Sequence, residues 1–359
     1  MKYFDVIIVG GGASGVSAAI NIKKQNHDLN VLILEQNDKI LKKVLKTGNG
    51  KCNLGNTNLD ISHYYHGELF EEYIKEFNAI DFFKSLGLLT KIDNVGRIYP
   101  YSETATSVIN ILLKALDDLD VLVKTDYNVN KIIKKDNYII NNEYEAKYLV
   151  LATGSNSQAI TNGYELAKSL SHNITPLKGV LTPIKLTEET KSLQGLKVKC
   201  ELKAKGFDRL GEILFKEDGI SGILALEASR YVNDGDIIYL DFAPDKEEND
   251  LLEFVNAGSV EDRLNGILPK MLAKKIIDKK DYSLIKNYPF KVKGLYDTKY
   301  SQVTRGGVNI TEIKNTLESK VNSNLYFGGE ILDIDGDCGG YNLYLAWLSG
   351  YIIGKEINR

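Results

Sequence analysis

Three glycines and one acid near the N-terminus are spaced for binding a ligand that contains phosphate. The glycines are Gly10, Gly12 and Gly15, and they follow a Val- and Ile-rich run, residues 4–9, that is typical of a buried strand. Gly10 would permit a tight strand-to-helix turn, Gly12 would let a pyrophosphate approach the backbone, and Gly15 would let helix and strand pack closely. Glu35 lies 20 residues after Gly15 (35 − 15) and can accept hydrogen bonds from a ribose.

These residues belong to one predicted β-α-β unit. Apolar residues at helical spacing follow the glycines, and residues 29–35 read as a second strand that ends in Glu35. The N-terminus of the helix would offer unpaired N–H groups and the positive end of its dipole to phosphates. A carboxylate at position 35 would repel a 2′-phosphate, so the unit predicts a site for FAD or NAD rather than NADP.

Two later strand ends distinguish FAD from NAD. Residues 146–156 read as a buried strand that ends in Ala152-Thr153-Gly154, and residues 325–336 read as another that continues into Gly329-Glu330 and Asp333. Small residues at strand ends let a ligand approach the backbone at the carboxyl edge of a parallel sheet. The sequence has no second GxGxxG, so one dinucleotide site and two further strand ends favour a single large dinucleotide, FAD, laid across the sheet.

A resemblance to a known family rests on motifs spread over nearly the whole chain. The stretches are "KTGNGKCNLGN" (46–56), "GRIYPYSETA" (96–105), "GEILFKEDGISG" (211–222), "QVTRGGVNI" (302–310) and "DGDCGGYNLYLAWLSGYIIG" (335–354). With the glycine loop, they are similar to the BaiN-like, aminoacetone-oxidase-type flavoproteins, which have two dinucleotide-binding domains. The resemblance implies an α/β fold: a Rossmann-like FAD-binding domain formed by residues 1–157 and 296–359. An inserted, β-rich substrate domain would span 158–295, with a short helical part at about 245–290.

The same resemblance implies which residues contact FAD. The pyrophosphate would lie on the glycine loop, the adenosine ribose on Glu35, and the adenine against the backbone of Val129. Lys43 matches a position near the cofactor, and Gly329, Glu330 and Asp333 would lie along its ribityl and phosphate part. The complete set of expected cofactor-binding residues is Gly10, Gly12, Ala13, Ser14, Gly15, Glu35, Lys43, Gly50, Cys52, Asn53, Val129, Ala152, Thr153, Gly154, Gly329, Glu330, Asp333, Gly340, Tyr341 and Asn342.

The glycine pair before the last apolar run is expected to face the flavin ring. Amides at Gly339 and Gly340, at the start of a closing helix, could meet the O2 and N1 edge, where negative charge appears on reduction. Tyr341 and Asn342 would flank the ring. Asn53, Cys52 and Tyr341 are the candidates for the reaction face, although no side chain need act as an essential acid or base when the flavin carries the chemistry.

The sequence departs from the family in two places. The family commonly has Gly-Gly-Gly-Arg where this chain has Gly48-Asn49-Gly50-Lys51, so the planar guanidinium fork is lost while the charge is kept. The chain is also shorter than usual between about residues 245 and 294.

Composition and charge narrow the remaining functional classes. The 359 residues include 45 basic and 48 acidic side chains, a net charge of −3, which argues against a non-specific nucleic-acid binder. The three cysteines have neither disulfide nor zinc spacing, and reduced thiols in a cytoplasmic protein are the expectation. We expect no bound metal and no membrane span, and we interpret the His63–His66 pair in "SHYYHG" as a surface loop.

Three functional hypotheses follow. The first is an FAD-dependent oxidoreductase that takes electrons from NADH or NADPH and reduces a small unsaturated organic substrate by hydride transfer through flavin N5. The second is an FAD-dependent oxidase of a small amine or aminoketone that produces hydrogen peroxide. The third is a protein that acts on tRNA or binds flavin without catalysis, for which the lysines between 39 and 51 are the only hint. The oligomeric state is left open.

Overall fold

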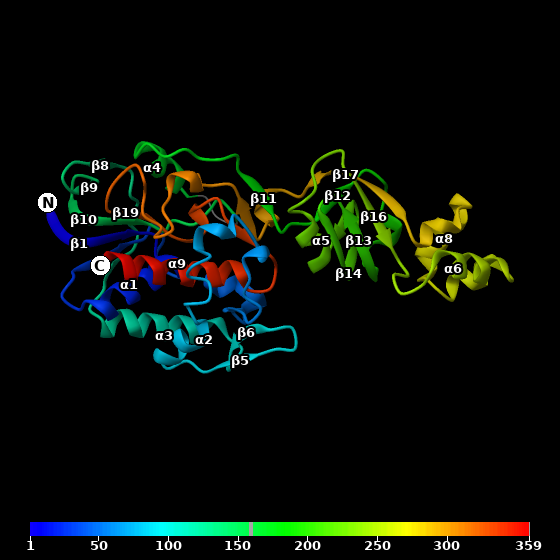
Figure 1. Cartoon of the computed structure of the whole chain (residues 1–359), viewed down its shortest axis with the longest axis horizontal. Coiled ribbons are helices and arrows are strands. Elements are labelled where there is room, and N and C mark those ends of the chain that lie inside the picture. The colour runs from blue at the N-terminus through cyan, green and yellow to red at the C-terminus, as the bar shows by residue number, and fades with distance from the viewer. Residues whose placement is uncertain (158–160, 359) are drawn as a thin grey trace. The chain divides into compact units, whose positions relative to one another are not determined.

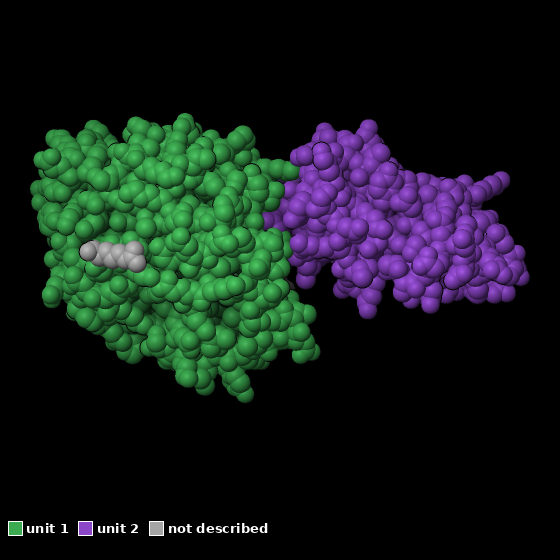
Figure 2. Space-filling model, in the orientation of Figure 1, with its two compact units in different colours: residues 1–178, 303–359 green, residues 179–302 purple. Residues whose placement is uncertain are grey.

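The chain forms two compact units, which Figure 2 shows in different colours. The computed structural model describes residues 1–157 and 161–358, apart from the side chain of Asn49. Unit 1 comprises residues 1–178 and 303–359, and unit 2 comprises residues 179–302. The chain leaves unit 1 at strand β11 (Lys178–Val180) and returns to it at β18 (Val303–Arg305).

Unit 1 is built on a seven-stranded sheet whose centre is parallel. The strands are β1 (Lys2–Val9), β2 (Val31–Leu34), β7 (Leu122–Lys124), β8 (Ile132–Lys134), β9 (Tyr138–Ile140), β10 (Tyr144–Leu151) and β19 (Leu325–Phe327). They are ordered β7-β2-β1-β10-β9-β8, and β19 pairs with β10 in parallel. Strands β1, β2, β7 and β10 are parallel, whereas β8 and β9 are antiparallel to their neighbours. This is the α/β, Rossmann-like arrangement predicted from the sequence, and it gathers the carboxyl ends of β1, β2, β10 and β19 at one edge.

The described part of unit 1 contains five α-helices, and two of them pack closely together. They are α1 (Ala13–Gln25), α2 (Ala79–Ser85), α3 (Ala105–Asp118), α4 (Gly163–Ser169) and α9 (Tyr341–Ile357). Figure 1 shows the red α9 beside the dark blue α1. A Cβ added to Gly350 would lie 2.5 Å from the backbone nitrogen of Ala18, so the two helices approach at glycine positions. The Ser17 hydroxyl donates to the Trp347 carbonyl at 2.8 Å across the same contact.

Two small sheets complete unit 1. One has the order β3-β6-β5 and contains β3 (Gly55–Asn56), β5 (Thr90–Ile92) and β6 (Arg97–Pro100). The other pairs β4 (Tyr64–Tyr65) with β20 (Asp335–Gly336), two segments that are far apart in sequence. The second pairing brings the loop around residue 64 to the segment that precedes α9.

Unit 2 is a closed six-stranded barrel with its own hydrophobic core. Its strands, in the order β12-β15-β14-β13-β16-β17, are β12 (Ile184–Leu186), β13 (Lys197–Ala204), β14 (Phe207–Lys216), β15 (Gly219–Ser221), β16 (Ile237–Asp241) and β17 (Tyr288–Leu295). Its helices are α5 (Ile223–Ala228), α6 (Glu248–Asn256), α7 (Val260–Asn265) and α8 (Lys270–Lys279). The strands alternate buried and exposed residues, as in Lys197–Ala204, because only one face of each lines the barrel core.

The boundaries between the units differ from those expected from the sequence. The first lies at 178/179 instead of 157/158, because α4 contributes Tyr164 and Leu166 to the core of unit 1. The second lies at 302/303 instead of 295/296, since the Tyr296 N–H donates to the Pro183 carbonyl at 3.1 Å within unit 2. In the described part of the chain, the helices are too short or too polar to span a bilayer.

Candidate functional site

The glycine loop after β1 is shaped by two close backbone contacts. Gly10 has a φ of +108°, and a Cβ there would lie 2.4 Å from the carbonyl oxygen of Ala152 at the end of β10. A Cβ on Gly15 would lie 2.0 Å from the carbonyl oxygen of Gly10. Both positions therefore require glycine, the first for the turn between parallel strands and the second for the packing of α1 on it.

Gly12 is different, because it faces open space. No described heavy atom lies within 4 Å of a Cβ added to this residue. Gly12 is also the N-cap of α1, and no described side chain caps that helix, whose first residues are Ala13 and Ser14. An uncapped helix N-terminus beside an open glycine fits a phosphate group, which would accept from the first-turn amides.

Glu35 lies at the carboxyl end of β2 and is held against the glycine loop. Its Oε2 accepts from the Gly11 N–H at 2.8 Å, and its Oε1 accepts from the Asn37 N–H at 2.9 Å. The Glu35 N–H donates to the carbonyl of Lys124 on β7 at 2.9 Å. The carboxylate is thus buried and fixed beside the glycine loop, and the contribution of Asn37 was not predicted from the sequence.

Lys43 and Glu330 are brought together although 287 residues separate them (330 − 43). The Lys43 Nζ lies 3.6 Å from Glu330 Oε2 and 3.4 Å from the Ser155 carbonyl oxygen. Glu330 Oε1 accepts from the hydroxyls of Ser155 and Ser157, at 2.6 and 3.1 Å, and from the Thr304 N–H at 3.0 Å. Lys43 therefore lies at the turn after Ala152-Thr153-Gly154, beside residues expected to contact the cofactor.

The second strand end, at β19, meets the start of α1. A Cβ on Gly329 would lie 3.0 Å from the Ser14 Cβ, and the Ser14 hydroxyl lies 2.8 Å from that of Ser349 on α9. At the other strand end, just after β10, the Thr153 Oγ1 is buried and has no hydrogen-bond partner among the described residues. An orphaned hydroxyl at a strand end is an observation that fits a bound polar ligand.

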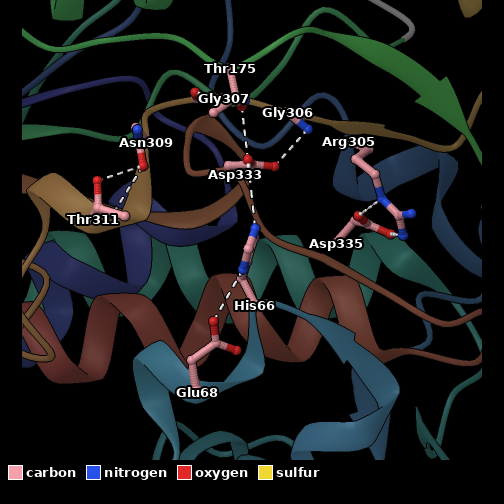
Figure 3. A network of polar contacts seen from close by, with 10 residues as sticks. All are labelled: His66, Glu68, Thr175, Arg305, Gly306, Gly307, Asn309, Thr311, Asp333 and Asp335. Carbon is pink, nitrogen blue, oxygen red and sulfur yellow. Dashed lines mark hydrogen bonds and ion pairs between the residues drawn. The ribbon is translucent and has the colours of Figure 1, made fainter.

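Asp333 is the centre of the polar network in Figure 3. Its Oδ1 accepts from the Gly306 N–H at 2.9 Å, and its Oδ2 accepts from the Thr175 hydroxyl at 2.8 Å. The His66 Nε2 lies 3.9 Å from Asp333 Oδ2, and the His66 Nδ1 lies 3.1 Å from Glu68 Oε1. The carboxylate is buried, and its proposed contact with the ribityl chain would add to partners that it already has.

The N-terminal end of α9 begins after Gly339 and Gly340, which we call the glycine mouth. It packs against the loop that contains Asn53. Gly340 has a φ of +104°, and a Cβ there would lie 2.5 Å from the Gly55 carbonyl oxygen and 2.6 Å from Asn53 Oδ1. The side-chain amide of Asn342 makes two hydrogen bonds with the backbone of Gly336. Its Oδ1 accepts from the Gly336 N–H and its Nδ2 donates to the Gly336 carbonyl, each at 2.8 Å. Asn342 therefore holds the loop before α9 in place, whatever contact it makes with a flavin.

His63 and Tyr341 form part of the same mouth, and the histidine was not among the residues expected there from the sequence. The His63 Nδ1 lies 3.0 Å from Asp337 Oδ2, and its Nε2 lies 3.0 Å from Asn58 Nδ2. Its ring stacks on Tyr341, with 4.3 Å between centroids and 23° between planes. His63 and His66 lie in a partly exposed loop, and the structure adds that both face buried aspartates from the far end of the chain.

The remaining candidates lie at separate places in unit 1. Val129 is buried, and its carbonyl accepts from Asn162 Nδ2 at 2.6 Å. Gly50 ends a 3-10 helix (Val44–Gly50), has a φ of +83°, and has no described atom within 4 Å of an added Cβ. The structure thus groups the expected residues around β1, β10, β19 and α9, with Val129 and Gly50 outside the contacts described above.

Comparison with known proteins identifies the family. Residues 4–356 match the family described as "HI0933-like protein Rossmann domain". The chain belongs to this HI0933-like family.

Two sequence relatives and one solved structure extend this assignment. The HI0933-like chain is 32% identical over 404 aligned positions to a 3-dehydro-bile acid delta(4,6)-reductase of Clostridium scindens, covering 97% of each chain. It is 25% identical to a ribosomal RNA dihydrouridine synthase of Haemophilus influenzae, covering 100% of this chain and 99% of the relative. A quinol fumarate reductase of E. coli shares the fold, with a TM-score of 0.52 and 13% identity, over 100% of this chain and 70% of the other.

The HI0933-like chain is an FAD-dependent oxidoreductase. The residues described above fit that cofactor: an uncapped helix start, an open glycine, a buried acid beside the glycine loop and an orphaned hydroxyl at a strand end. Among the described residues, no group of three or more His, Cys, Asp or Glu side chains is arranged to hold a metal ion.

Cys52 of this HI0933-like chain lies in a poor environment for thiolate chemistry. The side chain is fully buried, and burial raises the pKa of its thiol to about 11. The thiol is therefore protonated at neutral pH, which argues for a packing role over a redox role.

Proposed function

We propose that this chain is an FAD-dependent reductase that takes electrons from NADH or NADPH and delivers them to a carbon–carbon double bond conjugated to a carbonyl in a small organic substrate. Bound FAD would supply hydride transfer through its N5. The observation that carries the proposal is the 32% identity, across 97% of both chains, to a protein named as a bile acid delta(4,6)-reductase. That name describes reduction of double bonds in a molecule that also carries a 3-keto group.

The residues of the chain support this chemistry by what they offer the cofactor. The uncapped start of α1 and the buried Glu35 would bind the adenosine diphosphate part of the cofactor. Burial raises the pKa of the Cys52 thiol to about 11, which keeps it protonated. The chain would therefore position the cofactor and polarise the substrate, while the bound cofactor carries the electrons.

The alternative electron acceptor that we consider is uridine in ribosomal RNA. The observation that favours it is the 25% identity, over the full length of this chain, to a protein named as a ribosomal RNA dihydrouridine synthase. Uridine also carries a double bond conjugated to a carbonyl, so the chemistry at the acceptor would be the same. The net charge of −3 favours the small molecule, since RNA binding usually needs a basic surface.

The test measures reduction of the flavin by the electron donor and its reoxidation by the electron acceptor in two separate steps. Purified holoenzyme is mixed anaerobically with NADH or NADPH, and flavin absorbance is followed; the proposal expects rapid bleaching by one of them. The reduced enzyme is then mixed anaerobically with a 4,6-dien-3-one bile acid or with ribosomal RNA transcribed without modification. In a separate reaction, the oxidised enzyme is mixed with aminoacetone in aerated buffer.

Each result of this experiment has a definite meaning. Fast anaerobic reoxidation by the dienone supports the proposal, and reoxidation by the RNA with formation of dihydrouridine supports the alternative acceptor instead. Absence of bleaching by either nicotinamide, together with hydrogen peroxide formed from aminoacetone in air, would overturn both in favour of an amine oxidase.

A further inference from the structure

The run Asp333-Ile334-Asp335-Gly336-Asp337 buries three carboxylates at alternate positions. Their exposed fractions are 5%, 0% and 2%. Each faces a different cationic or ionisable side chain: Asp333 meets His66, Asp335 meets Arg305, and Asp337 meets His63. Two of these pairs appear in Figure 3. A buried carboxylate needs such a partner, so the identity of each partner decides what each pair can do.

Of the three partners, only the histidines belong to the side chains that commonly act as general acids. Arg305 holds Asp335 with two bonds, Nε to Oδ2 at 2.7 Å and a terminal nitrogen to Oδ1 at 3.0 Å, and a guanidinium does not release its proton near neutral pH. An imidazole has two ring nitrogens and can pass on a proton from one of them while the other keeps its partner. The pair with Arg305 is therefore structural, and proton transfer is left to His63 or His66.

His63 is the better placed of the two histidines. Its Nδ1 is within hydrogen-bond distance of Asp337 at 3.0 Å, whereas the His66 Nε2 is 3.9 Å from Asp333, beyond hydrogen-bond distance. The His63 ring lies flat on Tyr341, the first residue of α9. His63 is thus oriented by a buried carboxylate at the mouth of the helix expected to face the reacting ring.

The surroundings of His63 can accommodate both of its protonation states. In the present geometry Asn58 Nδ2 lies 3.0 Å from Nε2, which makes Nε2 an acceptor and places the ring proton on Nδ1, toward Asp337. Asn58 is exposed, so its side chain is free to turn. With its Oδ1 toward the ring, it would accept from a protonated Nε2.

We propose that His63, oriented by Asp337, supplies the proton that reduction of a conjugated double bond requires. The inference rests on the proposed function. Reduction adds a hydride to the β-carbon, with its two electrons coming from the nicotinamide by way of the bound cofactor, and shifts the double-bond electrons toward the carbonyl. The His63 Nε2–H bond then breaks, a C–H bond forms at the α-carbon, and the neutral imidazole regains a proton from water.

The two half-reactions separate this role from cofactor binding. His63→Gln and a matched control, His27→Gln, are purified as holoenzymes; His27 is exposed near the end of α1, outside the site. In His63→Gln we expect bleaching by the nicotinamide within about twofold of wild type, and reoxidation by the dienone slowed by about 100-fold or more, which is typical of a lost general acid. His27→Gln should match wild type in both steps.

Rescue by imidazole distinguishes a proton donor from a residue that only packs. Added imidazole should restore at least part of the reoxidation rate of His63→Ala. Reoxidation of His63→Gln within threefold of wild type, or no rescue of His63→Ala, overturns the proposal. If wild type itself is reduced by the nicotinamide but is not reoxidised by the dienone, the proposed function fails first and the role of His63 fails with it.

A measurement independent of turnover covers the case in which the His63 variants fail to fold. In wild-type holoenzyme with ¹⁵N-labelled histidine, the resonances are assigned with variants of the other three histidines, His27, His66 and His172. The saturated ketone product should shift the His63 Nε2 resonance at saturation. A shift supports the proposal, and an unmoved His63 resonance overturns it.

Discussion

Replacement of Gly12 by alanine tests where the cofactor phosphates bind. The backbone of Gly12 has φ −79° and ψ −171°, which an alanine adopts without strain, and no described atom lies within 4 Å of the added Cβ. The protein without FAD should therefore be as stable as wild type, or more stable by about 0.4–1 kcal/mol, because alanine reduces the entropy of the unfolded chain.

The same methyl group should weaken FAD binding. It would occupy the space through which a phosphate reaches the first-turn amides of α1. Loss of one hydrogen bond to a charged group costs about 1.5–3 kcal/mol. At about 1.4 kcal/mol per tenfold change, the affinity for FAD should fall by roughly 10- to 150-fold.

The assay combines FAD titration, followed by flavin fluorescence, with thermal unfolding in the presence and absence of FAD. Gly12→Ala should lose most of the stabilisation that added FAD gives, because ligand stabilisation depends on concentration relative to Kd. The control is Gly15→Ala, whose Cβ would lie 2.0 Å from the Gly10 carbonyl oxygen and should destabilise the protein with or without FAD. Wild-type affinity in a folded Gly12→Ala would refute the placement of the pyrophosphate at this helix.

Three further predictions concern charge and burial. Iodoacetamide at pH 8 should label Cys338, which is partly exposed, and leave Cys52 unlabelled in native protein, as peptide mass spectrometry can check; comparable labelling would contradict the raised pKa of Cys52. Asp335→Asn should lower the free energy of unfolding by about 3 kcal/mol in denaturant titrations, because it leaves the charge of Arg305 uncompensated; a loss below about 1 kcal/mol would contradict this. Burial lowers the pKa of His172, so the unfolded chain binds more protons below about pH 6.5 and stability should fall from there toward the folded pKa; His172→Gln should show a smaller loss between pH 7 and 5, and an unchanged loss would exclude His172 as its source.

The dinucleotide-binding part of the fold was predictable because its signals are local. The turn at Gly10, the close packing at Gly15 and the acid after β2 all lie within the first 35 residues. Their expected roles follow from the geometry of one β-α-β unit, because the turn, the helix and the acid come one after another in the sequence. The structure adds what spacing could not supply, namely that Gly12 faces open space while Gly15 does not.

The polar residues around α9 were harder to predict because their partners are distant in sequence. His63 meets Asp337 across 274 positions, and Lys43 meets Glu330 across 287. A histidine pair in a polar loop gives no sign in itself of the carboxylates that it will contact. The alternation of aspartates at 333, 335 and 337 was a usable signal, since three acids on a short run next to a buried helix need partners if they are buried as well.

That alternation also explains why the site depends on the whole of unit 1. Asp333 binds Thr175 and the backbone of Gly306, whereas Asp337 binds the loop after β3 through His63. Three separate parts of the chain therefore converge on one short run before α9. Because an unpaired buried carboxylate is costly, the mouth of α9 is expected to form only when all three have folded onto it. Local loosening of any of them would disturb the glycine mouth before it disturbed the sheet.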